Sequence, residues 1–231
     1  MSAARLAGAL VLTLAVCALP SRGLAQRSAE AFVDDVERAN ALRVTVELDP
    51  ALAFGVGYVR TLPIEIERFA RRLALHVDLT AAMGGTSWDL TGGATMALFE
   101  GAGPNVLASI DLELKLAQND VHTALVYGYG VALRPGWFDP VWYVAAEASL
   151  RGTFAASLFH RQAYRDEVPS AGDGTYLTGQ LALYLGAVVG FQIERALVIG
   201  LRFAWRVPYT LESYAPWVQP YTVNLELGWR F

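Results

Sequence analysis

The stretch that decides the fold is VNLELGWRF, residues 223–231. Every second residue in it is apolar: Val223, Leu225, Leu227, Trp229 and Phe231. Successive side chains of a β-strand point to opposite faces, so this stretch predicts a strand with one wholly apolar face. The last residues of a soluble domain are usually frayed and polar. This face therefore needs an apolar partner or an apolar medium.

The same two-residue period recurs along the chain. The segments that carry it are 42–62, 73–80, 88–98, 106–116, 121–133, 142–158, 177–193, 197–207 and 221–231. Turn-forming residues separate them at 83–87, 100–105, 117–120, 134–140 and 194–195. Two longer polar connections lie at 160–174 and 208–220. We therefore predict an all-β domain over residues 42–231.

The N-terminal residues follow other patterns. Residues 1–25 predict a cleaved secretory signal peptide, with Arg5 ahead of a short apolar run and Gly-Leu-Ala before the cleavage point. The alternative is a lipoprotein signal at Cys17, which the preceding valine does not favour. Residues 26–41 predict a short periplasmic helix with one apolar stripe.

Composition excludes several classes of protein. The chain is 54% hydrophobic and only 17% charged, against roughly 25% charged in ordinary soluble domains. No apolar run after the signal approaches the roughly 20 residues of a membrane-spanning helix. Cleavage would remove Arg5, Arg22 and the only cysteine, Cys17, and lower the net charge from −4 to −6. A chain with this charge is not a nucleic-acid binder.

Alternating strands suit either a soluble barrel with its apolar face inside or a membrane barrel with its apolar face outside. Three observations favour the membrane barrel. Several segments are 11 to 19 residues long, whereas soluble strands have a mode near 5–6 residues. The polar face is mostly small residues, and the chain has a single lysine, Lys115. The tryptophans lie near segment ends, where interfacial aromatic girdles belong.

At this point VNLELGWRF resembles the C-terminal β-signal of bacterial outer-membrane β-barrel proteins, which ends in a phenylalanine, here Phe231. The resemblance implies a transmembrane antiparallel up-and-down barrel in the outer membrane of a Gram-negative bacterium. It also implies insertion by the barrel-assembly machinery and closure of the last strand on the first. The sequence has nine such segments, but a barrel with both termini in the periplasm needs an even number of strands. Eight strands result if one segment among 73–133 does not span the membrane. We favour ten, which needs 42–62 to bend at Asp49-Pro50, although its unbroken alternation suggests one long strand.

Charged residues on the polar parity predict a lumen network. We place in it Glu47, Asp111, Glu113, Lys115, Glu147, Arg151, Arg202, Arg206, Glu226 and Arg230. The favoured interpretation is a set of paired charges that fills the interior, because charges buried away from water must be paired. The alternative is a narrow, porin-like path for ions or small solutes.

An outer-membrane enzyme, a lipid or peptide hydrolase, is a further alternative. It needs a nucleophile, a base and an orienting acid. We assign no catalytic residue; the candidates are His76, Asp78, Ser149, Glu147 and His160. No residues have metal-ligand spacing, and no cofactor is expected.

The connection 160–174 is the densest polar cluster of the chain. Candidate binding residues in it are His160, Arg161, Tyr164, Arg165 and Asp173. They could bind sugar, lipopolysaccharide phosphate or a protein partner. The prediction is thus a monomeric barrel, surrounded by outer-membrane lipid and lipopolysaccharide, with a structural, adhesive or ligand-binding role that uses loops 160–174 and 208–220.

Overall fold

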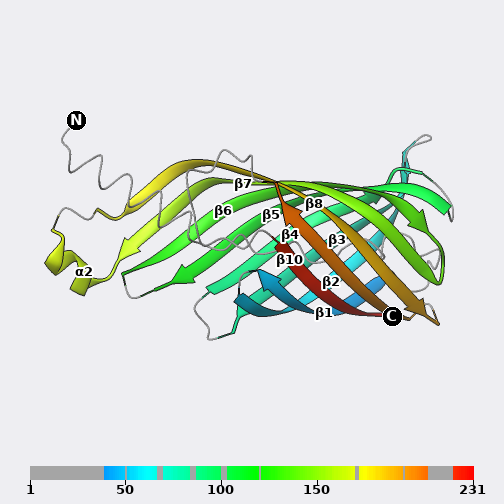
Figure 1. Cartoon of the computed structure of the whole chain (residues 1–231), viewed down its shortest axis with the longest axis horizontal. Coiled ribbons are helices and arrows are strands. Elements are labelled where there is room, and N and C mark those ends of the chain that lie inside the picture. The colour runs from blue at the N-terminus through cyan, green and yellow to red at the C-terminus, as the bar shows by residue number, and fades with distance from the viewer. Residues whose placement is uncertain are drawn as a thin grey trace.

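The computed structural model describes residues 39–49, 51–66, 70–83, 87–99, 103–119, 121–169, 172–194, 196–207 and 221–231. Ten strands form one closed antiparallel barrel, in which each strand pairs with its sequence neighbours and β10 returns to β1 (Figure 1). The strands are β1 (Asn40–Asp49), β2 (Ala51–Ile66), β3 (Ala70–Ala82), β4 (Ser87–Ala97), β5 (Gly103–Gln118), β6 (His122–Phe138), β7 (Trp142–His160), β8 (Gly174–Ile193), β9 (Leu197–Arg206) and β10 (Tyr221–Arg230). A short helix, α2 (Gln162–Glu167), lies between β7 and β8.

Some predicted segments lie outside the described residues. These are the signal peptide, residues 1–25, nearly all of the helix predicted over 26–41, and the connection 208–220. Asn40 and Ala41, at the end of the predicted helix, belong to β1. In the described part of the chain, no helix is both long enough and apolar enough to cross a membrane.

The barrel has ten strands because the stretch 42–62 is a hairpin. In its register Leu42 lies opposite Tyr58 and Leu48 opposite Leu52. Every such pair joins two residues of the same parity, so the chain reverses direction around residue 50 without moving its apolar residues to the other face. Unbroken alternation is therefore compatible with a reversal, and our argument for one long strand was wrong.

The turn predicted over 134–140 is also wrong over residues 134–138, which belong to β6. Strand β6 continues to Phe138, and its pairing with β7 passes from Leu133 directly to Gly136. Pro135 lacks an N–H and cannot donate to such a ladder, and a Pro-Gly pair is typical of turns, but here the pair lies within the strand. The chain turns later, where Asp139 Oδ1 accepts a hydrogen bond from Val141 N–H (3.0 Å).

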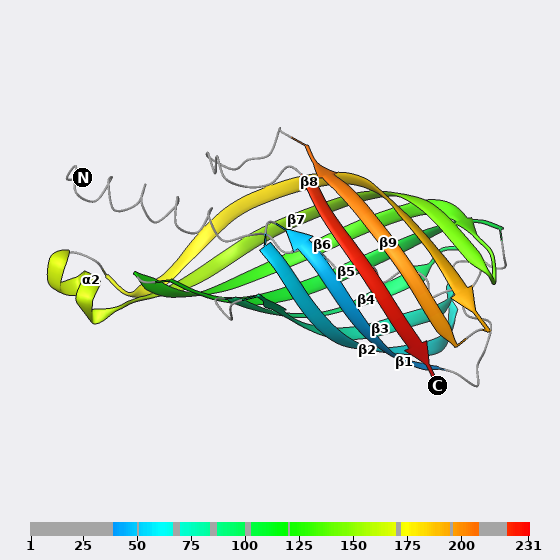
Figure 2. The same ribbon diagram turned by 60° about the horizontal axis from the view of Figure 1, so that its bottom comes forward.

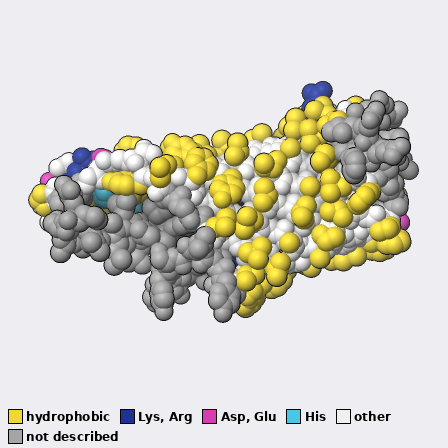
Figure 3. Space-filling view, turned by 90° about the horizontal axis from the view of Figure 1, so that it is seen from above, with side chains coloured by type: hydrophobic (Ala, Val, Ile, Leu, Met, Phe, Trp, Pro, Cys, Tyr) yellow, Lys and Arg dark blue, Asp and Glu magenta, His cyan; other side chains and the backbone are white. Residues whose placement is uncertain are grey.

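The barrel is inverted relative to a soluble one. Leu112 and Phe203 are 65% and 46% exposed on the outside, whereas Glu147 and Arg202 are 3% and 0% exposed on the inside. On the face that Figure 3 shows, hydrophobic side chains cover the wall between the two ends. An outer surface of this kind is stable against lipid and unstable in water.

Tryptophans mark two levels of this wall. All five described tryptophans are 40–57% exposed. Trp137, Trp142 and Trp229 lie near the end of the barrel that carries the C-terminus, and Trp88 and Trp205 near the opposite end. Indole rings at both ends of an apolar band are typical of the two membrane interfaces.

The C-terminal strand closes the barrel, as the resemblance implied. In the β1–β10 register Leu42 lies opposite Trp229. Beyond it, Phe231 N–H donates to the carbonyl of Asn40 (2.9 Å), and Asn40 N–H donates back to Phe231 (3.2 Å). The last residue is thus part of the ladder.

The strands differ in length, and the longest ones extend beyond the rest of the barrel. β7 has 19 residues and β8 has 20, whereas β1, β9 and β10 have 10 each. Figures 1 and 2 show β6, β7 and β8 running far past β9 and β10 toward α2. We call residues 122–127, 154–168 and 172–182 the projection.

A β-bulge marks the base of the projection. The β6–β7 register shifts between Tyr127 and Gly128, so that one extra residue of β7 is accommodated. Beyond it the inner face changes from polar to apolar, with Ala156 and Leu158 at 0% and 1% exposure.

Candidate functional site

The interior wall of the barrel carries the ten residues of the predicted lumen network. Eight of them are at most 9% exposed: Glu47, Asp111, Glu113, Glu147, Arg151, Arg202, Glu226 and Arg230. Lys115 and Arg206 are partly buried. Charges at this depth are stable only with partners, so the interior is best described by its ion pairs.

The strongest of these clusters centres on Glu147 in β7. Arg202 donates from Nε to both carboxylate oxygens (3.1 and 2.9 Å) and from Nη2 to Oε1 (2.6 Å). Arg134 donates to Oε2 from Nε (3.0 Å). The same two arginines also donate to Thr222 (3.3 Å) and Ser109 (3.2 Å), which joins strands β5, β6, β7, β9 and β10. All three charged side chains have no exposed surface.

Two further pairs reach across an intervening strand. Arg43 in β1 forms a double hydrogen bond with Asp78 in β3, through Nε (2.6 Å) and through Nη2. Gly57 in β2 lies opposite both residues, and a Cβ there would lie 2.7 Å from Arg43 Nε. The glycine therefore leaves the space in which the pair forms.

The second pair repeats this arrangement two strands further on, from β3 to β5 across β4. His76 Nε2 in β3 is hydrogen-bonded to Asp111 Oδ1 in β5 (2.7 Å). Gly93 in β4 lies between them, and a Cβ there would lie 2.7 Å from His76 Nε2. Inward glycines between charged strands are thus part of the network.

Charge is unevenly distributed around the interior. Strands β3, β4 and β5 carry four carboxylates, with His76 and Lys115 beside them; the carboxylates are Asp78, Asp89, Asp111 and Glu113. Lys115 Nζ lies 3.3 Å from Glu113 and 3.6 Å from Asp89. Strands β6 to β9 carry the arginines Arg134, Arg151, Arg202 and Arg206 around Glu147. One wall is therefore acidic and the facing wall is basic.

The hydrolase candidates do not come together. His76 pairs with Asp111, while Asp78, its neighbour in sequence, pairs with Arg43. Ser149 lies on β7, with β4, β5 and β6 between it and His76 on β3. His160 is eleven residues further along β7, which is about 35 Å in a strand. No nucleophile, base and acid converge among the described residues.

Sequence reasoning missed Arg134 and Arg43 as members of the network. Arg134 was assigned to a turn, although it lies in β6 at 0% exposure. Arg43 was recognised as polar, but its partner Asp78 lies 35 residues away. A sequence signal for the Arg43–Asp78 pair was Gly57, an inward-facing glycine on the strand between them. A residue without a side chain at that position lets the side chains of the two flanking strands meet.

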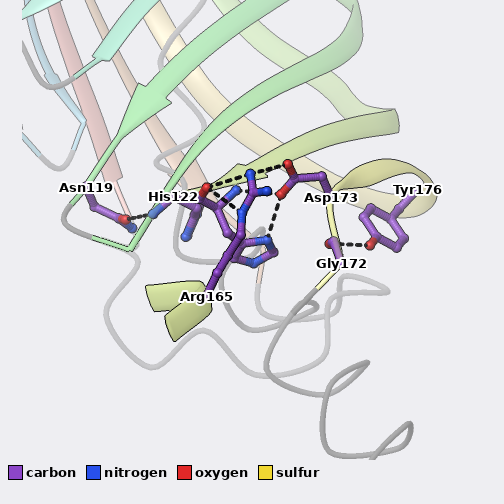
Figure 4. Close-up of polar contacts among 7 residues, drawn as sticks. Asn119, His122, Arg165, Gly172, Asp173 and Tyr176 are labelled. Atoms are coloured by element: carbon purple, nitrogen blue, oxygen red, sulfur yellow. Dashed lines mark hydrogen bonds and ion pairs between the residues drawn. The ribbon is translucent and has the colours of Figure 1, made fainter. Parts of the chain in front are cut away.

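The second cluster lies at the tip of the projection, around Asp173 (Figure 4). Asp173 Oδ1 accepts hydrogen bonds from His160 N–H (2.8 Å) and the His160 ring (3.2 Å). Arg165 Nη2 donates to Asp173 Oδ2 (2.5 Å) and, with Nε, to the His160 carbonyl (3.0 and 3.1 Å). Tyr164 stacks on the His160 ring at 5.5 Å. The cluster holds α2 against the ends of β7 and β8.

Four of the five predicted binding residues therefore converge at the tip. Arg161, the fifth, has an exposed side chain and donates its N–H to the Val121 carbonyl (2.9 Å). The His160 N–H, then the His160 ring and Arg165, lower the pKa of the Asp173 carboxyl. In the described residues, no group of three or more His, Cys, Asp or Glu side chains is placed to hold a metal ion.

No family model and no curated protein matches the chain. Among solved structures, the β-domain of the Bordetella autotransporter BrkA is similar, with a TM-score of 0.42 and 11% identity over 84% of this chain and 99% of that one. The NanC porin has a TM-score of 0.39 and 6% identity, again over 84% and 99%. The likeness concerns the fold alone. With ten closed strands and an apolar exterior, the chain has the fold of a bacterial outer-membrane β-barrel.

Proposed function

We propose that this protein is an integral outer-membrane barrel that binds a ligand outside the cell through its projection. The α2 end would face outward, because both ends of the barrel domain and the short connection 194–196 lie at the other end. A cleaved signal peptide would export the chain to the outer membrane of a Gram-negative bacterium. The barrel-assembly machinery would then insert it as a monomer among lipid and lipopolysaccharide.

The observation that carries this proposal is the length of the projecting strands. A tilted strand crosses the membrane with about 9–11 residues, and β7 and β8 have 19 and 20. Roughly nine residues of each strand are thus not needed for the crossing. The strands remain hydrogen-bonded to one another beyond the membrane crossing, and the Asp173 cluster fixes their ends. A rigid extension of this kind supports a binding role better than a flexible loop would.

The interior supports a scaffold more than a catalyst. Its charges are engaged with one another, as around Glu147, and the hydrolase candidates lie apart. A second candidate function is a narrow path for ions or small solutes, which the facing acidic and basic walls favour. Conductance across a planar bilayer tests that function, and ohmic steps that change when Arg202 is replaced would support it.

The main proposal is tested by shortening the projection. In one variant a tight turn replaces residues 154–182, which removes the projecting parts of β7 and β8 together with α2, and in a control Glu167→Gln changes only an exposed residue of α2. Both should migrate faster unheated than boiled, because the barrel remains folded. Proteoliposomes of wild type and variants are then incubated with lipopolysaccharide, a glycan array and phage-displayed random peptides. The proposal predicts a probe that binds wild type and Glu167→Gln but not the shortened variant. Equal binding to all three overturns it.

A further inference from the structure

Strand β8 has a long segment that is paired on only one side. Its β7 partners run from Phe191 to Gly174, with a register shift between Gln180 and Leu177. Its β9 partners begin only at Tyr184, and the last backbone contact on that side is Val207 N–H to the Leu183 carbonyl (2.8 Å). In the described part of the chain, residues 174–182 therefore form a free sheet edge. Figure 2 shows β8 continuing toward α2 after β9 has ended.

Apart from the register shift between Leu177 and Gln180, the described residues give this edge none of the usual protection against strand pairing. Natural proteins cover or disrupt such edges with charges, prolines or short strands. The sequence of 174–182 is GTYLTGQLA, which contains no charged residue and no proline. Leu177 is 91% exposed beside it, a large apolar side chain in a segment beyond the membrane crossing. An edge of this length that no described residue covers, and that carries no charge or proline, is suited to pairing with another strand.

We propose that this edge binds an extended peptide segment of a partner protein, which adds to β8 as a further strand. The inference rests on the proposed function and specifies its partner. A free edge presents backbone N–H and C=O groups at strand spacing, and another extended backbone is the ligand that matches all of them. The exposed Leu177 adds a preference for an apolar residue on the outer face of the incoming strand.

Other occupants match the edge less well. Lipopolysaccharide phosphate would need cations, and residues 174–182 contain none. A second copy in the same membrane would be related by a two-fold axis along the membrane normal. The two β8 strands, each tilted by about 45°, would then cross at a steep angle instead of pairing along their edges. A peptide from outside has no such restriction on its orientation.

The tip cluster prepares the edge for binding. Asp173, directly before β8, is held by His160 and Arg165. At the start of the strand, the Tyr176 hydroxyl donates to the Gly172 carbonyl (3.0 Å) and the Thr175 hydroxyl is hydrogen-bonded to Ser157 (2.8 Å). An edge that is already ordered loses little conformational entropy when it binds, which favours affinity.

The backbone direction identifies the variants. The Leu183 carbonyl points toward β9, so by the two-residue alternation the Leu181 N–H points to the free edge. Leu181→Pro removes that donor without removing a hydrogen bond to β7, and Leu177→Lys places a charge beside the edge. The matched control is Thr123→Lys, on the same outer face but in β6, which has a strand on either side. Unchanged heat-modifiability shows that each variant folds.

The test uses a synthetic peptide selected from the phage library on wild-type proteoliposomes. We expect Leu181→Pro and Leu177→Lys each to weaken its binding at least tenfold, and Thr123→Lys to leave it unchanged. N-methylation of alternate peptide residues should abolish binding for one parity and spare the other. Equal effects of both parities, or wild-type binding by both edge variants, overturn strand addition. If lipopolysaccharide or a glycan binds the projection and no peptide does, the proposed function survives and this inference fails.

Discussion

The buried carboxylate of Glu147 offers the sharpest test of how the barrel interior is stabilised. Its side chain has no exposed surface and accepts four hydrogen bonds from the two arginines Arg134 and Arg202. Glu147→Gln keeps the size of the side chain and removes the charge. Two guanidinium groups would then remain buried without their counter-charge.

The expected loss is large compared with the stability of a protein. Breaking a buried ion pair by removing one partner costs about 3–5 kcal/mol, whereas total stabilities are about 5–15 kcal/mol. We expect the free energy of unfolding in lipid vesicles, measured by urea titration with tryptophan fluorescence, to fall by about this amount. The control Glu167→Gln, on exposed α2, should change it by less than about 0.5 kcal/mol.

A third variant separates lost pairing from lost shape. Replacing the cluster as a unit, with Glu147→Leu, Arg134→Met and Arg202→Met together, removes all three charges and should recover most of the stability. The reasoning is refuted if Glu147→Gln loses less than about 1 kcal/mol, because a buried and charged cluster cannot tolerate that change so easily. It is also refuted if the triple variant is the least stable of the three.

Three other outcomes are expected. Gly57→Ala should lower the urea midpoint of unfolding, because its Cβ would meet Arg43 and Asp78. The control Gly172→Ala should not, because the space around the added Cβ is open. Equal midpoints for the two variants would contradict the role of the inward glycine. The pKa of Asp173 is lowered, so its contribution to the tip is present above the ordinary aspartate range near pH 4 and is lost as the pH falls through the lower folded value. The protection factor of amide exchange in α2, which corrects for the pH dependence of the intrinsic exchange rate, should therefore fall in acid for wild type and should be low already at pH 7 for Asp173→Asn. Deletion of Phe231 removes two backbone hydrogen bonds between β1 and β10. It should reduce the amount of heat-modifiable barrel in the outer membrane. An unchanged amount would argue against the interpretation of residues 223–231 as a β-signal.

Alternation predicted where strands lie but not how many there are. The hairpin at residues 49–51 leaves the alternation unbroken because its partners share a parity, so alternation by itself suggests one long strand where the chain reverses. Strand β6 was shortened in the prediction because Pro135 and Gly136 are typical turn residues, although an outward proline is tolerated at that position. Both errors concern chain direction, which depends on pairing with a neighbouring strand.

The interior shows the same division. The alternation of the strands predicts that Glu147, Arg151 and Arg202 face the interior together with other charges. Which charge meets which does not, since His76 and Asp78 are neighbours in sequence and take partners on different strands. The offset between strands, and a glycine on the strand between, decide those pairs.

The sequence alone determined the class of this protein. The two-residue period, the sparse charge and the stretch 223–231 together indicate strands with an apolar outer face. The sequence can determine these properties because each of them is local to the chain. Only the tertiary structure decided that the strands number ten, that Arg134 and Arg202 converge on Glu147, and that β8 outruns β9 and leaves a free edge. These features depend on register, which is a relation between strands distant in sequence. A two-residue repeat is compatible with many registers, and the closed barrel selects one of them.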